Sequence, residues 1–257
     1  MPAIALALLE HDPDAIVLSE FRRTTGGQIR AVLADHGWTN QVCTAPSGSC
    51  NGMLLASREP LHPEPISMSG PESARRCVLA HLPEQDLTIA GVHAPHSGAG
   101  PGRRQFWEAL LRLAAHLRNR RAVIIGDFNT GRRRLDSTGR GPSLARVLDD
   151  LSGLGYVDAY RRIHRNRREY SWFSHTGSGY RIDHAYVSAP LADDLGGVRY
   201  SHVERGAGLS DHSLLVLETL AHSNAARCSD GRAMGRPTTP SGGDGSRCRV
   251  EISKKTA

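Results

Sequence analysis

The sequence predicts an α/β fold in which mixed β-sheets are covered by helices. Two aliphatic runs, Ala15–Leu18 and Ala122–Ile125, have the composition of buried strands. Residues 102–119 place apolar side chains along one helical stripe and arginines on the other face. Strands alternate with helices at first and dominate later, which favours mixed sheets over a purely parallel, doubly wound sheet.

The other elements follow from local patterns. We expect a short helix at 3–10, ended by the Asp12-Pro13 turn signal, and a helix over 27–36 that ends at Gly37. A further helix is expected at 143–152. The remaining predicted strands lie at 39–44, 51–57, 76–82, 86–93, 170–174, 180–188, 198–204 and 213–219.

The C-terminal part of the chain has a different composition. From about Ala221 it is rich in Ser, Gly, Pro and Arg, and such a segment cannot bury enough apolar surface to offset its chain entropy. We therefore predict a folded domain over 1–220 and a disordered basic tail over 221–257. The tail carries a net +4 of the formal charge of +6, and both lysines, Lys254 and Lys255. Charge alone thus does not separate a nucleic-acid-binding surface from a near-neutral domain with a basic tail.

Cysteine usage and hydropathy limit the class of protein. Five cysteines without a CxxC spacing argue against a zinc site and a disulfide framework, although a Cys43–Cys50 bridge stays open. No stretch approaches the length of a membrane span, and the apolar segment Met1–Leu9 lacks the basic residues of a signal peptide. We expect a monomeric, cytoplasmic protein.

Polar side chains follow the two aliphatic runs where each strand should end. Asp127 and Asn129 come directly after the second run, and residues two apart on an extended chain point the same way. Oxygen ligands gathered at one rim suit a hard cation such as Mg²⁺. Glu20 ends the first run in the same manner. The alternatives without a functional role are an ordinary turn at Gly126–Asn129 and a solvent-exposed acid at Glu20.

Two later segments repeat this pattern. Asp183 lies within a strand of period 2, where a buried carboxylate needs a cation or a hydrogen-bond donor, unless that face is solvated. Asp211 and His212 directly precede the strand that starts near residue 213. An acid beside an imidazole fixes the tautomer and charge of a hydrolase histidine, and it also occurs in solvated loops.

Taken together, the order of these segments resembles the endonuclease/exonuclease/phosphatase superfamily, and its exonuclease III and abasic-endonuclease branch in particular. The resemblance covers about residues 12–219. It implies a four-layer sandwich, with two mixed β-sheets packed face to face and flanked by helices. It is carried by the blocks Asp14–Glu20, Asn51–Arg58, Gly91–Pro95, Gly126–Asn129, Tyr170–Phe173, Arg181–Asp183 and Ser210–His212.

The resemblance also implies a role for each residue. Glu20 binds the catalytic Mg²⁺ or Mn²⁺, and Asp211 and Asp127 contribute to that metal site. Asp127 also positions or deprotonates the attacking water. The other catalytic residues are Asn129, which holds the phosphate or the water, Asp183, which orients His212, and His212, which stabilises the charge of the transition state.

Two features depart from the family pattern. His93 stands where exonuclease III-like enzymes usually carry Tyr; it resembles the deoxyribonuclease I arrangement, in which His assists the leaving group, unless it is a solvated strand-end His. Family members also begin with a strand carrying an Asn, but here the first Asn is Asn40, after Glu20. The first strand is thus missing: either about twenty upstream residues are absent, or the site works with one ligand fewer.

The predicted function is metal-dependent hydrolysis of DNA phosphodiesters. The alternatives are a phosphatase or phosphodiesterase acting on lipid or small phosphate esters, and an inactive truncated member of the family. Arg132–Arg134 either grip a phosphate backbone or form a solvated cluster. Trp172 and Phe173 either stack on a base or, as is more common for aromatic residues on strands, belong to the core.

Overall fold

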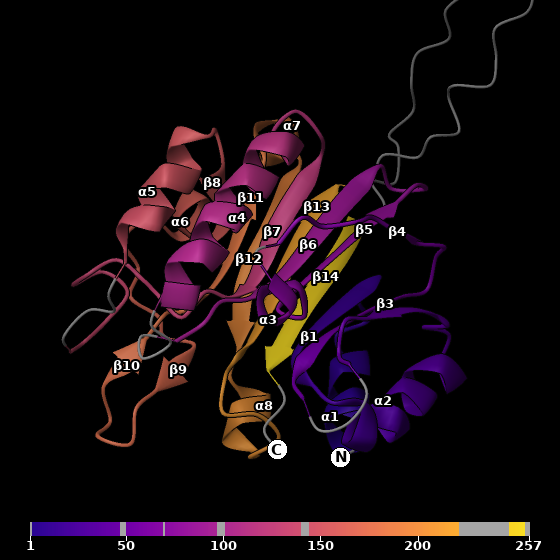
Figure 1. The fold of residues 1–257 in the computed structure, drawn as a ribbon. Helices are drawn as coiled ribbons and strands as arrows, with labels where there is room; N and C mark the ends of the chain where they lie inside the picture. Colours follow the sequence, from indigo (N-terminus) through magenta and orange to yellow (C-terminus); the bar gives the residue numbers. More distant parts are fainter. Residues whose placement is uncertain are drawn as a thin grey trace, which may run out of the picture.

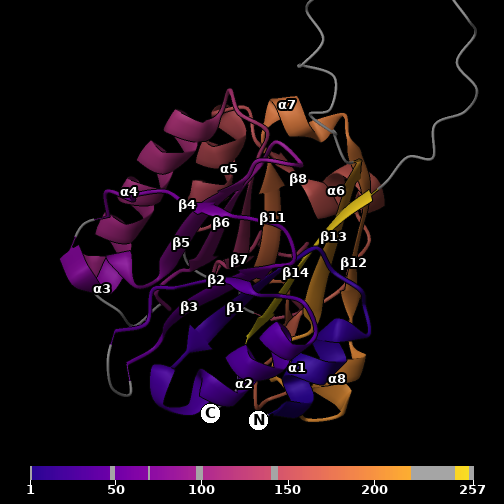
Figure 2. The ribbon, with the colours of Figure 1, turned by 90° about the vertical axis from the view of Figure 1, so that its right-hand side faces the viewer.

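Two β-sheets packed face to face form the centre of the molecule, and helices cover both outer faces (Figures 1 and 2). The computed structural model describes residues 2–46, 50–68, 70–96, 101–139, 144–220 and 247–254. This arrangement confirms the predicted four-layer α/β sandwich. No helix among these residues is both long and apolar enough to cross a lipid bilayer.

The first sheet has six strands, and β1 (Ala15–Phe21) lies near its middle. The strand pair β1–β14 is parallel and the other pairs are antiparallel, so the sheet is mixed. Across the sheet the strands are ordered β12 (Leu195–Ser201), β13 (Leu214–Leu220), β14 (Arg247–Lys254), β1, β3 (Gly52–Ser57) and β2 (Asn40–Cys43).

The second sheet is also six-stranded and mixed. Its strands β6 and β7 are parallel, and β7 pairs with β11 in the antiparallel sense. The strands are ordered β4 (His62–Pro63), β5 (Cys77–Leu82), β6 (Leu87–His93), β7 (Ala122–Asp127), β11 (Asp183–Val187) and β8 (Val157–Asp158).

The helices divide between the two outer faces. In Figure 2, α1 (Pro2–Leu9) and α2 (Arg23–Asp35) lie on one side of the sheets, and α4 (Pro101–Leu117) and α5 (Arg146–Gly153) lie on the other. The shorter elements are α3 (Gly70–Ala74), α6 (Ala159–His164), α7 (Ala189–Ala192), α8 (Val203–Gly206) and the hairpin of β9 (Trp172–Phe173) and β10 (Gly179–Tyr180).

Three apolar clusters hold these layers together. The largest fills the space between the sheets and includes Val17 and Val250 from the first sheet and Val123 and Ile125 from the second. A second cluster joins α4 and α5 to the second sheet, and a third joins α1 and α2 to the first. The strand residues alternate between the inner and an outer cluster, as the period of a strand requires.

The expectation of disorder after residue 220 fails for residues 247–254. These residues form β14, which lies between β13 and β1 as the yellow strand of Figure 1. Apolar and polar residues alternate in this strand, although the sequence around it is polar. The alternation buries Cys248 and Val250 in the core between the sheets. The first sheet therefore has no gap beside β1. Residues 221–246 lie outside the described part of the chain.

Two other elements differ from the local predictions. The strand expected over 180–188 is split: Gly179 and Tyr180 pair with β9, and pairing with β7 of the second sheet begins only at Asp183. The short helix α6, at 159–164, was not expected. Cys43 and Cys50 are both free thiols, so the bridge that the sequence left open is not formed.

A buried ion network fastens the loop after β7 to β11 and α6. Arg181 is fully buried and donates to Asp136 Oδ1 at 2.7 Å and to Asp158 Oδ2 at 2.6 Å. Arg161 also pairs with Asp136. Burial by itself would raise the pKa of the Asp136 and Asp158 carboxyls, but Arg181 holds the pKa of each below its usual range. Both carboxylates are charged and paired, as buried ions must be.

His184 belongs to the same buried region and is neutral. Its Nε2 lies 2.8 Å from the Thr130 carbonyl oxygen, to which it donates. Burial, together with the nearby Arg181 cation, lowers the pKa of His184 from 6.5 to about 4. The polar face that the sequence allowed on this strand is therefore not solvated, because His184 and Asp183 are both buried.

The insertion of β14 between β1 and β13 can be tested by placing a charge at the buried position 250. Val250→Asp should lower the free energy of unfolding by about 3 kcal/mol or more, because the carboxylate enters an apolar layer without a partner. Urea denaturation measures this loss. Leu220→Asp is the matched control, since Leu220 on the neighbouring β13 is 42% exposed; its effect should stay within about 0.5 kcal/mol. Equal, small effects at both positions would show that β14 is not docked.

The neutral state of His184 predicts a stability loss in mild acid. The unfolded chain binds the His184 proton near pH 6.5 and the folded chain only near pH 4. The contribution of His184 is therefore fully present above about pH 6.5 and is lost as the pH falls toward 4. Between pH 7 and 5 it amounts to about 2 kcal/mol. Urea denaturation of wild type and His184→Gln at both pH values should give a smaller difference for the variant; an equal difference would contradict the assignment.

Candidate active site

The carboxyl ends of three strands meet at one end of the sandwich and bring acidic and imidazole groups together. Glu20 lies at the end of β1, His93 is the last residue of β6 and Asp127 the last of β7. His93 and Asp127 are register partners across the parallel pair. The Nε2 atom of His93 lies 3.8 Å from Glu20 Oε1 and 3.8 Å from Asp127 Oδ2. His93 is buried, so it is not a solvated strand-end histidine.

Glycine is required just before Asp127. Gly126 has a φ of +152°, and a Cβ at this residue would lie 1.8 Å from the Val92 carbonyl oxygen of the adjacent β6. Only glycine therefore allows the two parallel strands to stay paired up to the residue that carries the acid. This close approach explains the glycine of the Gly126–Asn129 block in physical terms.

The chain turns after Asp127 so that Asn129 returns to it. Asn129 adopts a left-handed backbone with φ of +48°, which Asn tolerates better than most residues. Its backbone N–H donates to Asp127 Oδ1 at 2.8 Å, and its side-chain amide donates to Asp127 Oδ2 at 3.1 Å and to the Ala94 carbonyl at 2.8 Å. Asn129 thus fixes the Asp127 carboxylate on both oxygens.

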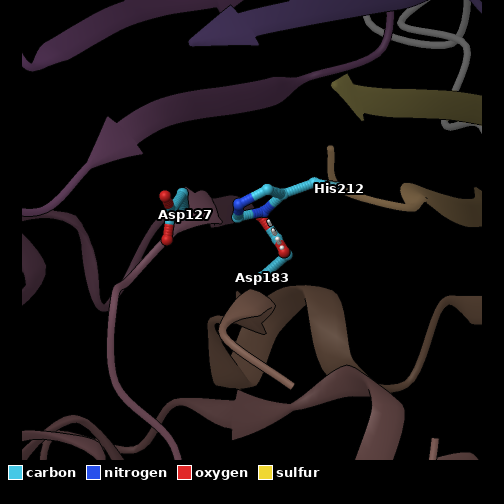
Figure 3. A group of neighbouring side chains, drawn as sticks. All are labelled: Asp127, Asp183 and His212. Carbon is cyan, nitrogen blue, oxygen red and sulfur yellow. Dashed lines mark hydrogen bonds and ion pairs between the residues drawn. The ribbon is translucent and has the colours of Figure 1, made fainter. Parts of the chain in front are cut away.

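The second acid and its histidine come from the other side of β7. Asp183, the first residue of β11, is the register partner of Asp127. Its Oδ2 lies 2.8 Å from Nδ1 of His212, and both side chains are buried. Figure 3 shows the His212 ring between the two acids. One ligand atom from each of Asp127, Asp183 and His212 lies within 4.8 Å of the other two.

Ser171 joins the segments that carry Asp183 and His212. Its buried Oγ accepts hydrogen bonds of 3.2 Å from the backbone N–H groups of Ile182 and Asp183. Its carbonyl accepts the Ser213 N–H at 2.7 Å. Because one residue contacts both segments, the distance between Asp183 and His212 is set by backbone bonds as well as by their own contact.

Glu20 and Asp211 are the more accessible acids of the site. The Glu20 backbone is left-handed, with φ of +56°, at a register shift between β1 and β3, and such an irregularity re-aims a side chain at a strand end. Asp211 Oδ2 lies 4.0 Å from His212 Nε2. The Oδ1 atom of Asp211 is buried and has no hydrogen-bond partner among the described residues.

This group of side chains has the donor set of a divalent cation site. Glu20, Asp127, Asp183 and Asp211 supply carboxylate oxygens, the ligands that Mg²⁺ and Mn²⁺ prefer. The unpartnered oxygen of Asp211 is a ligand atom without a protein partner in the described chain. The residues present therefore fit the metal that the sequence predicts. The structure brings together all the predicted site residues: Glu20, His93, Asp127, Asn129, Asp183, Asp211 and His212.

Some residues that support the site were not assigned from the sequence. Arg103 of α4 is buried and donates to the Pro95 and Asn129 carbonyls, at 3.1 and 3.2 Å, which ties together the loops after β6 and β7. Ser171 and Arg181 lie within two of the sequence blocks that carry the family resemblance, and no other sequence feature indicated their roles. No sequence feature distinguished Arg103, because arginines are frequent on the same helix.

The aromatic and basic candidates lie around the site. Trp172 is half-buried, with its ring centroid 6.3 Å from that of His212. Phe173 is 41% exposed, so the expectation that it belongs to the core is wrong. The Arg205 guanidinium lies 4.5 Å from the centroid of its ring. Arg132 pairs with Asp149, whereas Arg133 and Arg134 are exposed.

Comparison with solved structures shows the same fold in a phosphatase, an endonuclease and an exonuclease. A 3′ phosphatase, NExo, from Neisseria bound to a product DNA hairpin is 23% identical, with a TM-score of 0.71 over 85% of this chain and 94% of that chain. An AP endonuclease from Archaeoglobus fulgidus is 23% identical, with a TM-score of 0.68 over 82% and 91% of the two chains. A 3′-5′ exonuclease, NExo, from Neisseria meningitidis is 23% identical, with a TM-score of 0.67 over 82% and 92%.

These likenesses concern the fold, and the sequence itself places the chain in a family. The model of the Endonuclease/Exonuclease/phosphatase family matches residues 3–212, a range that contains the whole group of acids and histidines described above. The chain therefore belongs to the Endonuclease/Exonuclease/phosphatase family.

Proposed function

We propose that this protein is a divalent-metal-dependent hydrolase that cleaves phosphate esters of DNA. The observation that carries this proposal is the convergence of Asp127, Asp183 and His212 within 4.8 Å, with His93 3.8 Å from Asp127 and Glu20. Phosphate ester hydrolysis needs an oriented water, groups that stabilise growing negative charge and a proton for the leaving oxygen. This cluster offers a residue for each need.

The proposed roles follow from the contacts. Asp127, held on both oxygens by Asn129, accepts the proton of the water as its oxygen attacks phosphorus. Asp183 accepts the Nδ1 proton of His212 and so leaves Nε2 directed at the phosphate. As the ester bond breaks, His93 gives a proton to the departing oxygen. A divalent cation bound by Glu20 and Asp211 would neutralise charge on the phosphate.

Two features support DNA as the substrate. Structures of the same fold include a phosphatase bound to a product DNA hairpin and an AP endonuclease. In this chain, an exposed aromatic ring at Phe173 and exposed Arg133 and Arg134 lie on segments next to the site. Exposed rings stack on nucleobases, and arginines bind phosphates.

The activity is tested with three substrates: a DNA hairpin with a 3′ phosphate, an abasic duplex and a chromogenic phosphodiester, each with Mg²⁺, Mn²⁺ or excess chelator. We expect DNA cleavage that the chelator abolishes. Asp127→Asn, Asp183→Asn and His212→Ala should each lower kcat by roughly 10²- to 10⁴-fold. Turnover of the chromogenic ester alone would instead support a phosphodiesterase of small esters.

Matched controls lie outside the sheets, near the ends of β7 and β11 that are remote from the site. Asp193 is exposed and follows α7, beyond the far end of β11 from Asp183, and His116 is exposed near the end of α4. Asp193→Asn and His116→Ala should keep wild-type kcat. If the three site variants matched these controls, or if cleavage persisted in chelator, the proposal would be refuted.

A further inference from the structure

The segment 161–168, at the end of α6 and in the connection to β9, concentrates positive charge on the surface. Five of its eight residues are arginines: Arg161, Arg162, Arg165, Arg167 and Arg168. The last four of these are exposed. Their combined charge of +4 exceeds the net charge of +2 that residues 1–220 carry as a whole. The rest of this folded part therefore has a net negative charge, and the segment is a distinct basic surface.

Arg161 is the arginine that gives this segment its structure. Its guanidinium pairs with the buried Asp136. It also donates to the carbonyl oxygens of Arg165 and Arg167, at 2.9 and 2.7 Å. These bonds fix the backbone of the turn after α6, so the exposed arginine side chains project from an ordered support.

The exposed arginines are not neutralised by the protein itself. Arg162, Arg165 and Arg168 make no side-chain hydrogen bond or ion pair with the residues that the structure describes. Glu169, the acid that follows the segment, contacts Arg167 at 3.4 Å and none of these three. Like charges held this close repel each other. A polyanion laid across the segment would supply the opposite charge that the fold does not.

The segment leads directly into the active site. Arg168 precedes Ser171 by three residues, and Ser171 accepts hydrogen bonds from the backbone N–H groups of Asp183 and Ser213, the residue after His212. Three residues of extended chain span at most about 11 Å. That length corresponds to roughly three base pairs of duplex DNA, which rise by about 3.4 Å each. The arginines therefore lie within reach of phosphates a few nucleotides from a DNA ester bound at the site.

A second basic loop borders the segment. Asp136, the partner of Arg161, belongs to the loop after β7, and this loop carries the exposed Arg133 and Arg134. The loop also contains Asn129, which holds Asp127. Two arginine-bearing stretches thus meet at one buried ion pair, and each is continuous with residues of the active site.

We propose that the segment 161–168 is a DNA-backbone-binding surface, which receives duplex phosphates beyond the ester that is cleaved. This inference rests on the proposed function and deepens it, because a surface of this kind selects a polymeric substrate over a small phosphate ester. The planar guanidinium matches phosphate oxygens in pairs. Such contacts orient a duplex on a protein without reading its sequence.

An anionic membrane is the other polyanion with a complementary charge, and the shape of the segment disfavours it. Helices that lie on membranes bury an extended apolar face in the lipid. The helix α6 has six residues, and its exposed large hydrophobic side chain is Ile163. A short turn with projecting arginines fits a phosphate backbone better than a lipid surface.

The test compares the double variant Arg165→Gln/Arg168→Gln with the double variant Arg112→Gln/Arg118→Gln. Arg112 and Arg118 are also exposed, and they lie in the second half of α4 and just after it, near the end of β7 that is remote from Asp127. The control therefore removes the same charge far from the site. Binding of a labelled DNA duplex with a 3′ phosphate is measured by fluorescence anisotropy in chelator, over a range of salt concentrations. Cleavage of the same duplex is measured with Mg²⁺.

Arg165→Gln/Arg168→Gln should bind the duplex roughly tenfold more weakly, and the slope of log affinity against log salt should fall by about two, because two phosphate contacts are lost. The KM for the duplex should rise by a similar factor and kcat should change much less, since these contacts form equally with substrate and transition state. Arg112→Gln/Arg118→Gln should match wild type in each measurement. Urea denaturation checks that both double variants keep the stability of wild type.

Each other outcome has a distinct meaning. Equal duplex binding by the two double variants would overturn the assignment of the segment, whether or not the wild type cleaves DNA. Loss of binding to phosphatidylglycerol vesicles in Arg165→Gln/Arg168→Gln, with duplex binding unchanged, would assign the segment to a membrane and also overturn it. A wild-type protein that binds the duplex through these arginines but cleaves no DNA substrate with Mg²⁺ or Mn²⁺ would keep the surface and refute the proposed function instead.

Discussion

Strand register places two buried carboxylates next to each other, and the rest of the site depends on this constraint. Asp127 and Asp183 are register partners on adjacent strands, and neither side chain is open to water. Two like charges in such surroundings are unfavourable unless donors and cations compensate them. The protein supplies Asn129 to one acid and His212 to the other. A divalent cation would complete this compensation, so an arrangement that is costly without a cation suits the proposed hydrolysis of phosphate esters.

The segment that leads into β11 carries the charge that fixes the surroundings of Asp183. Arg181 lies two residues earlier and pairs with Asp136 in the loop after β7 and with Asp158 at the start of α6. That loop contains Asn129, which holds Asp127. Removing Arg181 would leave the buried Asp158 without its guanidinium partner and Asp136 with Arg161 alone, so the network is stable only in its complete form. The block Arg181–Asp183 therefore joins a structural residue to a proposed catalytic one, and the first keeps the second in place.

The sequence predicted those parts of the fold that depend on local patterns. The aliphatic runs and the amphipathic helix became β1, β7 and α4, because burial of apolar residues decides both local structure and layer order. The acids at strand ends were found for the same reason. Asp136 and Asp158 escaped notice because only the tertiary fold brings them to Arg181. Phe173 was misjudged because the short β9–β10 hairpin lies outside both main sheets.

The strand β14 was missed because its signal is weaker than that of its surroundings. Eight residues with apolar side chains at alternate positions stand in a segment dominated by Ser, Gly, Pro and Arg, and composition predicts disorder for such a segment. What gives these residues a fixed structure is a non-local event, the insertion between β1 and β13, which pairs the backbone of β14 on both sides. Composition measures only what a segment can bury by itself.

The register of β14 is set at its amino-terminal end, far from the active site. A slip by one residue would take Val250 out of the core between the sheets and turn Arg249 toward it, which is costly. A slip by two would keep the faces but break polar contacts at the other end of the strand. There, the Arg249 N–H donates to Asp14 at 2.7 Å, and its guanidinium donates to Glu218 at 2.9 Å. Burial and these contacts therefore fix which residue of β14 stands beside Glu20, without any interaction at the active site itself.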